Sequence, residues 1–109
     1  MLTLICWVFG DQNPFSVKIK QDKLVDELKN AIVAEKPNRF QGIDADDLML
    51  WKKFIVSKER GSLQESELKI EDLLDAADEV GEHLQATPPT KHIHIIIKVP
   101  GKWDSDFVF

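Results

Sequence analysis

The chain has 109 residues, of which 43% are hydrophobic and 30% charged, values typical of one soluble domain with a single core. Its net charge of −5 argues against nucleic acid and anionic membranes as partners, because such binding depends on clustered Lys and Arg. Cys6 is the only cysteine, which excludes an internal disulfide and a cysteine-rich zinc site.

The N-terminal half predicts a hairpin followed by a helix. Residues 2–9 form a dense apolar run that ends at the turn sequence "GDQNP", and residues 15–20 alternate apolar and polar side chains as a half-buried strand does. No classical signal peptide is visible, because the first run lacks preceding basic residues and a following cleavage site. Helical spacing then begins near Asp22, a candidate N-cap, and stops at Pro37.

The C-terminal half predicts two more strands around a short helix. Residues 48–56 have strand character, with a break near the two lysines left open, and residues 57–66 are polar and turn-rich. Residues 70–81 carry apolar side chains at helical spacing, with Gly81 as a stop. Residues 92–99 form the last strand, and no segment is long enough to span a membrane.

This order of elements predicts an α+β domain. A hairpin, a helix and further strands suit a mixed sheet of four to five strands with one main helix packed across it, the ubiquitin-like β-grasp. In that arrangement the last strand lies centrally and parallel to the first. Central strands read as nearly continuous β-branched runs, as residues 92–99 do.

Five stretches, in order, resemble the N-terminal domain of the Crinkler (CRN) effectors of oomycetes and fungi. They are "MLTLICWVFG", "FSVKIKQDKLVDELKNAI", "EKPNRFQGIDADDLMLW", "LLDAADEVGE" and "HIIIKVP". The oomycete translocation motif LFLAK would fall at Leu50, Trp51, Lys52, Lys53 and Phe54, which resembles the fungal form. This N-terminal domain should end at Val99 and Pro100, so it spans residues 1–100, and residues 101–109 form a tail or the start of a linker.

The resemblance implies a secreted effector whose N-terminal domain supports delivery into a host cell, where the variable C-terminal part acts, often in the nucleus. The activities of those C-terminal domains are not assigned to this chain. Because residues 50–54 depart from LFLAK, the translocation role of that motif is assigned to them with less support. Expected partners are proteins, either host proteins or a second copy. No nucleic acid, small-molecule substrate or cofactor is expected.

Catalytic and metal sites are the weaker hypotheses. The sequence has no Gly-rich phosphate loop and no nucleophile motif, so no catalytic residue is proposed. His92 and His94 lie two residues apart on one strand, but a zinc site needs three or four ligands. His83 and Cys6 would have to converge on them, and Cys6 is expected to point into the core. No metal site is therefore expected.

Strand alternation predicts an exposed apolar sheet face. Ile93, Ile95, Ile97 and Val99 should face the helix together with Leu48 and Leu50. The opposite, open face should carry six partner-binding residues: Ile5, Trp7, Met49, Trp51, His94 and Ile96. A patch of this size usually marks an interface. Two alternatives remain open: residues 57–90 or the tail could fold over this face, or the chain could be an intracellular ubiquitin-like adaptor or dimerisation module.

Overall fold

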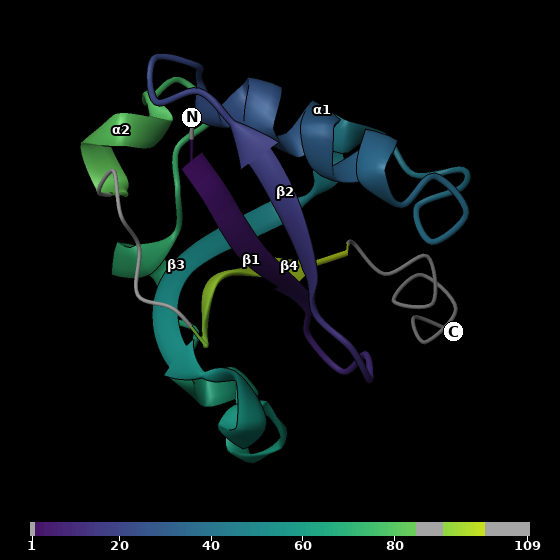
Figure 1. Cartoon of the computed structure of the whole chain (residues 1–109), viewed down its shortest axis with the longest axis vertical. Helices are drawn as coiled ribbons and strands as arrows, with labels where there is room; N and C mark the ends of the chain where they lie inside the picture. Colours follow the sequence, from purple (N-terminus) through teal and green to yellow (C-terminus); the bar gives the residue numbers. More distant parts are fainter. Residues whose placement is uncertain (1, 85–90, 100–109) are drawn as a thin grey trace, which may run out of the picture.

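The computed structural model describes residues 2–84 and 91–99. Its regular elements are β1 (Leu2–Val8), β2 (Phe15–Ile19), α1 (Val25–Glu35), β3 (Met49–Val56), α2 (Val80–His83) and β4 (His92–Lys98). Short 3-10 segments join them: η1 (Ala45–Asp47), η2 (Ser57–Ser62), η3 (Glu65–Glu67) and η4 (Ile70–Asp72). The predicted α+β fold is confirmed, since one main helix packs across a mixed four-stranded sheet in a ubiquitin-like β-grasp (Figure 1).

The sheet has the order β2-β1-β4-β3, so the last strand is central as predicted. β4 runs parallel to β1, with Cys6 opposite Ile95, and antiparallel to β3, with Leu50 opposite Ile97. β2 pairs with β1 as an antiparallel hairpin and forms one edge of the sheet. β3 is one continuous strand, so the break left open near the two lysines is not observed; the pairing of β3 with β4 instead shifts register between Lys52 and Ile55.

α1 covers one face of the sheet. Its side chains of Val25, Leu28 and Ile32 are fully buried, which fits a helix with one apolar stripe. They pack with residues of all four strands to form the helix-side core. Its buried members are Leu2, Leu4, Cys6, Val8, Val17, Ile19, Val25, Leu28, Ile32, Phe40, Leu48, Leu50, Leu74, Val80, Leu84, Ile95 and Ile97.

A segment far along the chain caps the first turn of α1. The N–H of Val25 donates to the carbonyl of Asp78 at 2.8 Å, and the N–H of Asp26 donates to the carbonyl of Ala76 at 3.1 Å. The cap residue is Leu24, and the structure shows no side-chain cap hydrogen bond there. The prediction of Asp22 as N-cap is therefore wrong, because tertiary contacts satisfy the N–H groups that a side chain would otherwise bind.

The predicted helix over residues 70–81 is also wrong. Only the 3-10 turn η4 forms at its start, and the helix α2 begins at Val80, just where Gly81 was expected to end one. Between them the chain is drawn onto the sheet edge, where the N–H of Leu74 donates to the carbonyl of Leu50 at 2.8 Å. Leu73 and Leu74 then enter different cores, which a continuous helix would not allow.

Candidate functional site

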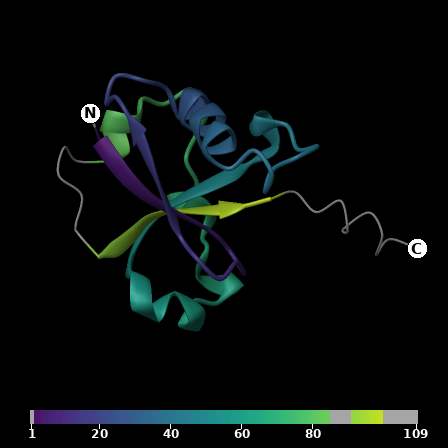
Figure 2. The same ribbon diagram turned by 45° about the vertical axis from the view of Figure 1, so that its right-hand side comes forward.

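The sheet face opposite α1 is covered in this structure. Trp7, Trp51, Ile93 and Ile96 form a second buried cluster, here called the tryptophan core. Partly buried side chains that pack against it are Ile5, Phe9, Ile55, Leu63, Leu68 and Leu73. Figure 2 shows the segment that follows β3 on the side of the sheet away from α1. The alternative in which residues after position 57 fold over this face is the one observed.

The predicted exposed face is therefore wrong as a description of the surface. Trp7 and Trp51 are 3% and 6% exposed, and His94 and Ile96 are 3% and 0% exposed. Ile5 is half-buried, and among the six predicted residues Met49 is the one that remains exposed, at 41%. Alternation assigned Ile5, Trp7, Trp51 and Ile96 to the correct side of the sheet, but it could not report what packs over that side.

Hydrogen bonds from the indole N–H groups attach the segment after β3 and the β1–β2 turn to the tryptophan core. Nε1 of Trp51 donates to the carbonyl of Lys69 at 3.1 Å, and Trp51 and Leu73 form an isolated β-bridge. Nε1 of Trp7 donates to the carbonyl of Asp11 at 2.8 Å, which ties the β1–β2 turn to the same core. Buried indoles normally find such a partner. Both tryptophans are therefore structural residues in this conformation.

One isoleucine of β4 lies on the unexpected side. Ile95 and Ile97 belong to the helix-side core and Val99 packs against it, as predicted. Ile93 instead belongs to the tryptophan core. The register shift in the β3–β4 pairing lies next to Ile93, and an irregularity of this kind breaks the period-2 relation between sequence and face.

His94 is a structural acceptor and does not look outward. Its Nδ1 accepts a hydrogen bond from the N–H of Ile5 at 2.9 Å, so this nitrogen carries no proton. The ring also meets the ring of Phe54 edge-on, with centroids 5.7 Å apart. A metal ion would have to compete with that hydrogen bond. Within residues 2–84 and 91–99, no group of three or more His, Cys, Asp or Glu side chains could hold a metal ion.

The five residues predicted to correspond to the translocation motif divide between core and surface. Leu50 is fully buried in the helix-side core and Trp51 lies in the tryptophan core. Lys52 and Phe54 are exposed, and Lys53 is half-buried. A receptor or membrane that met the folded domain would contact Lys52 and Phe54, and it would not reach Leu50.

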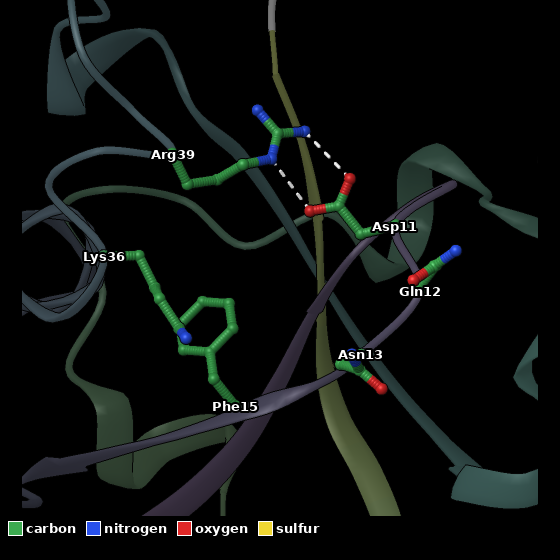
Figure 3. A pocket seen from close by; sticks show the side chains of 6 residues that line it. All are labelled: Asp11, Gln12, Asn13, Phe15, Lys36 and Arg39. Carbon is green, nitrogen blue, oxygen red and sulfur yellow. Dashed lines mark hydrogen bonds and ion pairs between the residues drawn. The ribbon is translucent and has the colours of Figure 1, made fainter.

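A shallow pocket lies between the β1–β2 turn and the end of α1, as Figure 3 shows. It has a volume of about 300 Å³ and is lined by Asp11, Gln12, Asn13, Phe15, Lys36 and Arg39. Arg39 donates two hydrogen bonds to the carboxylate of Asp11, at 2.8 and 3.1 Å, and this contact raises the pKa of Arg39. The ammonium of Lys36 lies 5.7 Å from the centre of the Phe15 ring. The residues that line this pocket do not include a nucleophile next to a general base.

Two other ionisable groups have shifted pKa values, and neither makes an active site. Complete burial raises the pKa of the Cys6 thiol far above its usual range, so it stays protonated and unreactive. The pKa of Asp26 is raised, first by a side-chain hydrogen bond with Asp46 and then by desolvation and repulsion from the same carboxylate. This carboxyl pair lies at the surface and joins the start of α1 to η1. A surface pair of this kind does not by itself indicate catalysis.

Sequence reasoning overlooked a groove between β2 and α1. Two adjoining hollows of about 490 and 320 Å³ share Lys18 and Ala31 in their lining. The full lining is Ser16, Val17, Lys18, Ile19, Lys20, Lys23, Glu27, Ala31, Ala34 and Glu35. The sequence signal was available as two lysines on the polar side of a short strand, followed by a third before the helix. That pattern suggested only a half-buried strand, because the edge position of β2 was not known.

Comparison with known proteins identifies the domain type. The family model of the Crinkler effector protein N-terminal domain matches residues 2–98. The chain is 35% identical over 101 residues to Crinkler effector protein 1 of Rhizophagus irregularis, covering 91% of this chain and 22% of the relative. Crinkler effector protein 108 of Phytophthora sojae is 48% identical over 52 residues, covering 47% of this chain and 6% of the relative.

The chain thus spans less than a quarter of the length of these curated relatives. None of the helices in the described segments is long and apolar enough to cross a membrane. The family model covers both ends of the β-grasp, from the first residue of β1 to the last residue of β4. The whole folded unit, and not a fragment of it, therefore matches, and the chain belongs to the Crinkler effector N-terminal domain family.

Proposed function

We propose that this chain is the non-catalytic N-terminal domain of a secreted Crinkler-type effector, which supports delivery into a host cell and makes contacts with proteins. The observation that carries the proposal is the family match over residues 2–98. The greater length of both curated relatives supports a modular protein, in which this domain precedes parts that act in the host, including its nucleus.

The test of delivery uses the full chain fused to the short strand of a split fluorescent protein, with the large fragment expressed only in the host cytosol. We expect fluorescence to appear inside host cells when a colonising fungus or oomycete expresses the fusion. The short strand fused to an unrelated β-grasp domain of the same size is the control. If the fusion protein stays in the producing cell during colonisation, delivery is refuted. Fractionating host nuclei tests the nuclear destination separately.

The motif-equivalent residues allow a sharper test of how delivery depends on sequence. Leu50→Ala removes a fully buried side chain and should cost about 2–5 kcal/mol, so we expect it to reduce delivery by unfolding the domain. Phe54→Ala, at a side chain 41% exposed, should leave the fold intact. A delivery loss with Phe54→Ala at unchanged thermal stability would mark a recognition residue. Equal delivery by the original chain and both variants would exclude the side chains of Leu50 and Phe54 from the process.

The domain boundary is part of the same proposal. Val99 packs against the helix-side core, and the family model ends at residue 98. We therefore place the end of the N-terminal domain at Val99 and Pro100, with residues 101–109 as a tail or linker. Pro100 itself lies outside the described residues. A chain shortened to residues 1–100 should unfold at the same temperature as the full chain. A drop of several degrees would show that the tail belongs to the folded unit.

The alternative function is an intracellular ubiquitin-like adaptor or dimerisation module. It relied on an exposed apolar face that the tryptophan core now occupies, so it needs a different surface. Sedimentation of the purified chain across a range of concentrations tests self-association directly. A stable dimer would favour this alternative over the delivery role only if secretion also failed.

A further inference from the structure

The outer side of β2 is an unpaired sheet edge. β2 is the terminal strand of the sheet and pairs only with β1. Among the described residues, no backbone hydrogen bond outside the regular elements involves residues 15–19. Every second N–H and C=O group of such a strand points away from its neighbour and can pair with another strand. The opposite edge differs, because Leu73 forms a bridge with Trp51 of β3.

A groove runs along this edge between β2 and α1. Its two hollows, of about 490 and 320 Å³, meet at Lys18 and Ala31. Val17 and Ile19 give it an apolar strand side, and Ala31 with Ala34 gives it a helix side of small residues. Side chains of an added strand alternate in direction, so every second one would enter this groove. Small helix residues leave room for β-branched or aromatic side chains there.

The charges around the groove select its ligand. Lys18, Lys20 and Lys23 line one of the two hollows, in a chain whose net charge is −5. None of the ion pairs within the described residues involves these lysines. Glu27 lines the same hollow, where its carboxylate accepts the N–H of Leu24 at 3.1 Å, and Glu35 lines the other hollow. Three lysines against one carboxylate leave this end of the groove with a net positive charge, which complements carboxylates.

Strand edge, groove and charge together define one kind of partner. We propose that β2 binds an extended, acidic peptide segment of a partner protein, which adds to the sheet as a fifth strand. Apolar side chains at alternate positions of the segment enter the groove beside Ala31 and Ala34. Carboxylates at one end of the segment lie against Lys20 and Lys23. The mode is β-strand addition, in which backbone pairing supplies affinity and side-chain pockets supply specificity. It rests on the protein-binding part of the proposed function and is independent of delivery.

The experiment titrates the ¹⁵N-labelled full chain with a synthetic peptide and follows its amide NMR signals. The probe has three aspartates followed by Val-Ile-Val-Ile, with both ends blocked, and a second probe has the reverse order. We expect at least one of them to saturate, with the largest shifts at residues 15–19 and at Ala31 and Ala34. A peptide with lysines in place of the aspartates should bind at least tenfold more weakly.

Charge reversal on the protein tests the same contact. The double variant Lys20→Glu, Lys23→Glu should weaken binding about tenfold, and added salt should reduce the difference. The matched control reverses two exposed lysines distant in sequence from the groove, Lys58→Glu and Lys69→Glu, and should bind like the original chain. If both double variants bind alike, the lysine end of the groove does not recognise the peptide and the proposal is overturned.

A third variant tests the groove itself. Ala34→Phe fills it from an exposed helix position and should abolish binding, whereas Asn30→Phe, also exposed on α1, should not. Largest shifts at β3 instead of β2, or equal binding of the lysine peptide, would overturn the proposal. So would a dimer of the free chain that pairs through β2, since a second copy would then occupy the edge. A chain that binds the peptide but is not delivered would support this inference and contradict the proposed function.

Discussion

Replacing Trp51 with alanine tests whether the second face of the sheet is a true core. Trp51 is 6% exposed, stands opposite Ile96 on β4, and donates its indole N–H to the carbonyl of Lys69. A buried tryptophan removes about 200 Å² from water, which at about 25 cal/mol per Å² corresponds to about 5 kcal/mol. The alanine methyl and partial collapse of the site recover some of this. We expect the free energy of unfolding to fall by about 3–5 kcal/mol.

The assay is urea unfolding followed by far-ultraviolet circular dichroism, with thermal melts alongside. The melting temperature should drop by about 15 °C. Met49→Ala is the matched control, because Met49 lies on the same strand and is 41% exposed; its cost should stay below about 1 kcal/mol. Amide exchange should also accelerate in residues 57–73 of the Trp51 variant. A loss of stability no greater than that of Met49→Ala would show that this face is open and the covering segment detached.

Two smaller perturbations test local features. The hydrogen bond with Asp46 raises the pKa of Asp26, so the folded chain holds this proton more tightly than the unfolded chain does. That stabilisation is complete below about pH 4 and is lost as the pH rises through the raised pKa of Asp26. At pH 7 the two carboxylates repel each other, so Asp46→Asn should raise the melting temperature at pH 7 and not at pH 3. An equal change at both pH values would contradict the coupling of Asp26 to Asp46. A Cβ added at Gly81 would lie 3.0 Å from the carbonyl oxygen of Gln21. Gly81→Ala should therefore lower the free energy of unfolding, measured in urea, by about 1 kcal/mol. The control is Gly61→Ala, where an added Cβ would have no atom within 4 Å and the free energy of unfolding should change by no more than about 0.5 kcal/mol.

The sheet and its central strand could be predicted because their signals are local and periodic. Leu48 and Leu50 are buried on either side of the exposed Met49, and the β-branched run of β4 marks a strand buried on both faces. Alternation of this kind predicts which face of the sheet each side chain lies on. The prediction is wrong for Ile93, where the pairing of β3 and β4 shifts register. A register shift depends on the partner strand, so one strand's sequence does not contain it.

The covering of the second face could not be predicted in the same way. Its apolar contacts come from Leu63, Leu68 and Leu73, which are spaced five residues apart among polar neighbours. That spacing fits neither the helical period nor strand alternation, so no amphipathic element is visible. The segment folds as three 3-10 turns, and one of the three leucines follows directly after each turn and packs against the core. The error about Asp22 has a similar origin, because the carbonyls of Ala76 and Asp78 cap α1 from a distant segment.

The covered face changes where a partner can meet this domain. With α1 on one side of the sheet and the tryptophan core on the other, recognition through a sheet face would require opening a core that we expect to cost several kcal/mol. An edge carries no such cost, because its backbone groups already face solvent. β2 is the edge that has both free pairing capacity and a lined groove. Delivery through Lys52 and Phe54 of β3 and peptide binding at β2 would then use opposite edges of one sheet, so substitutions at one should leave the other intact.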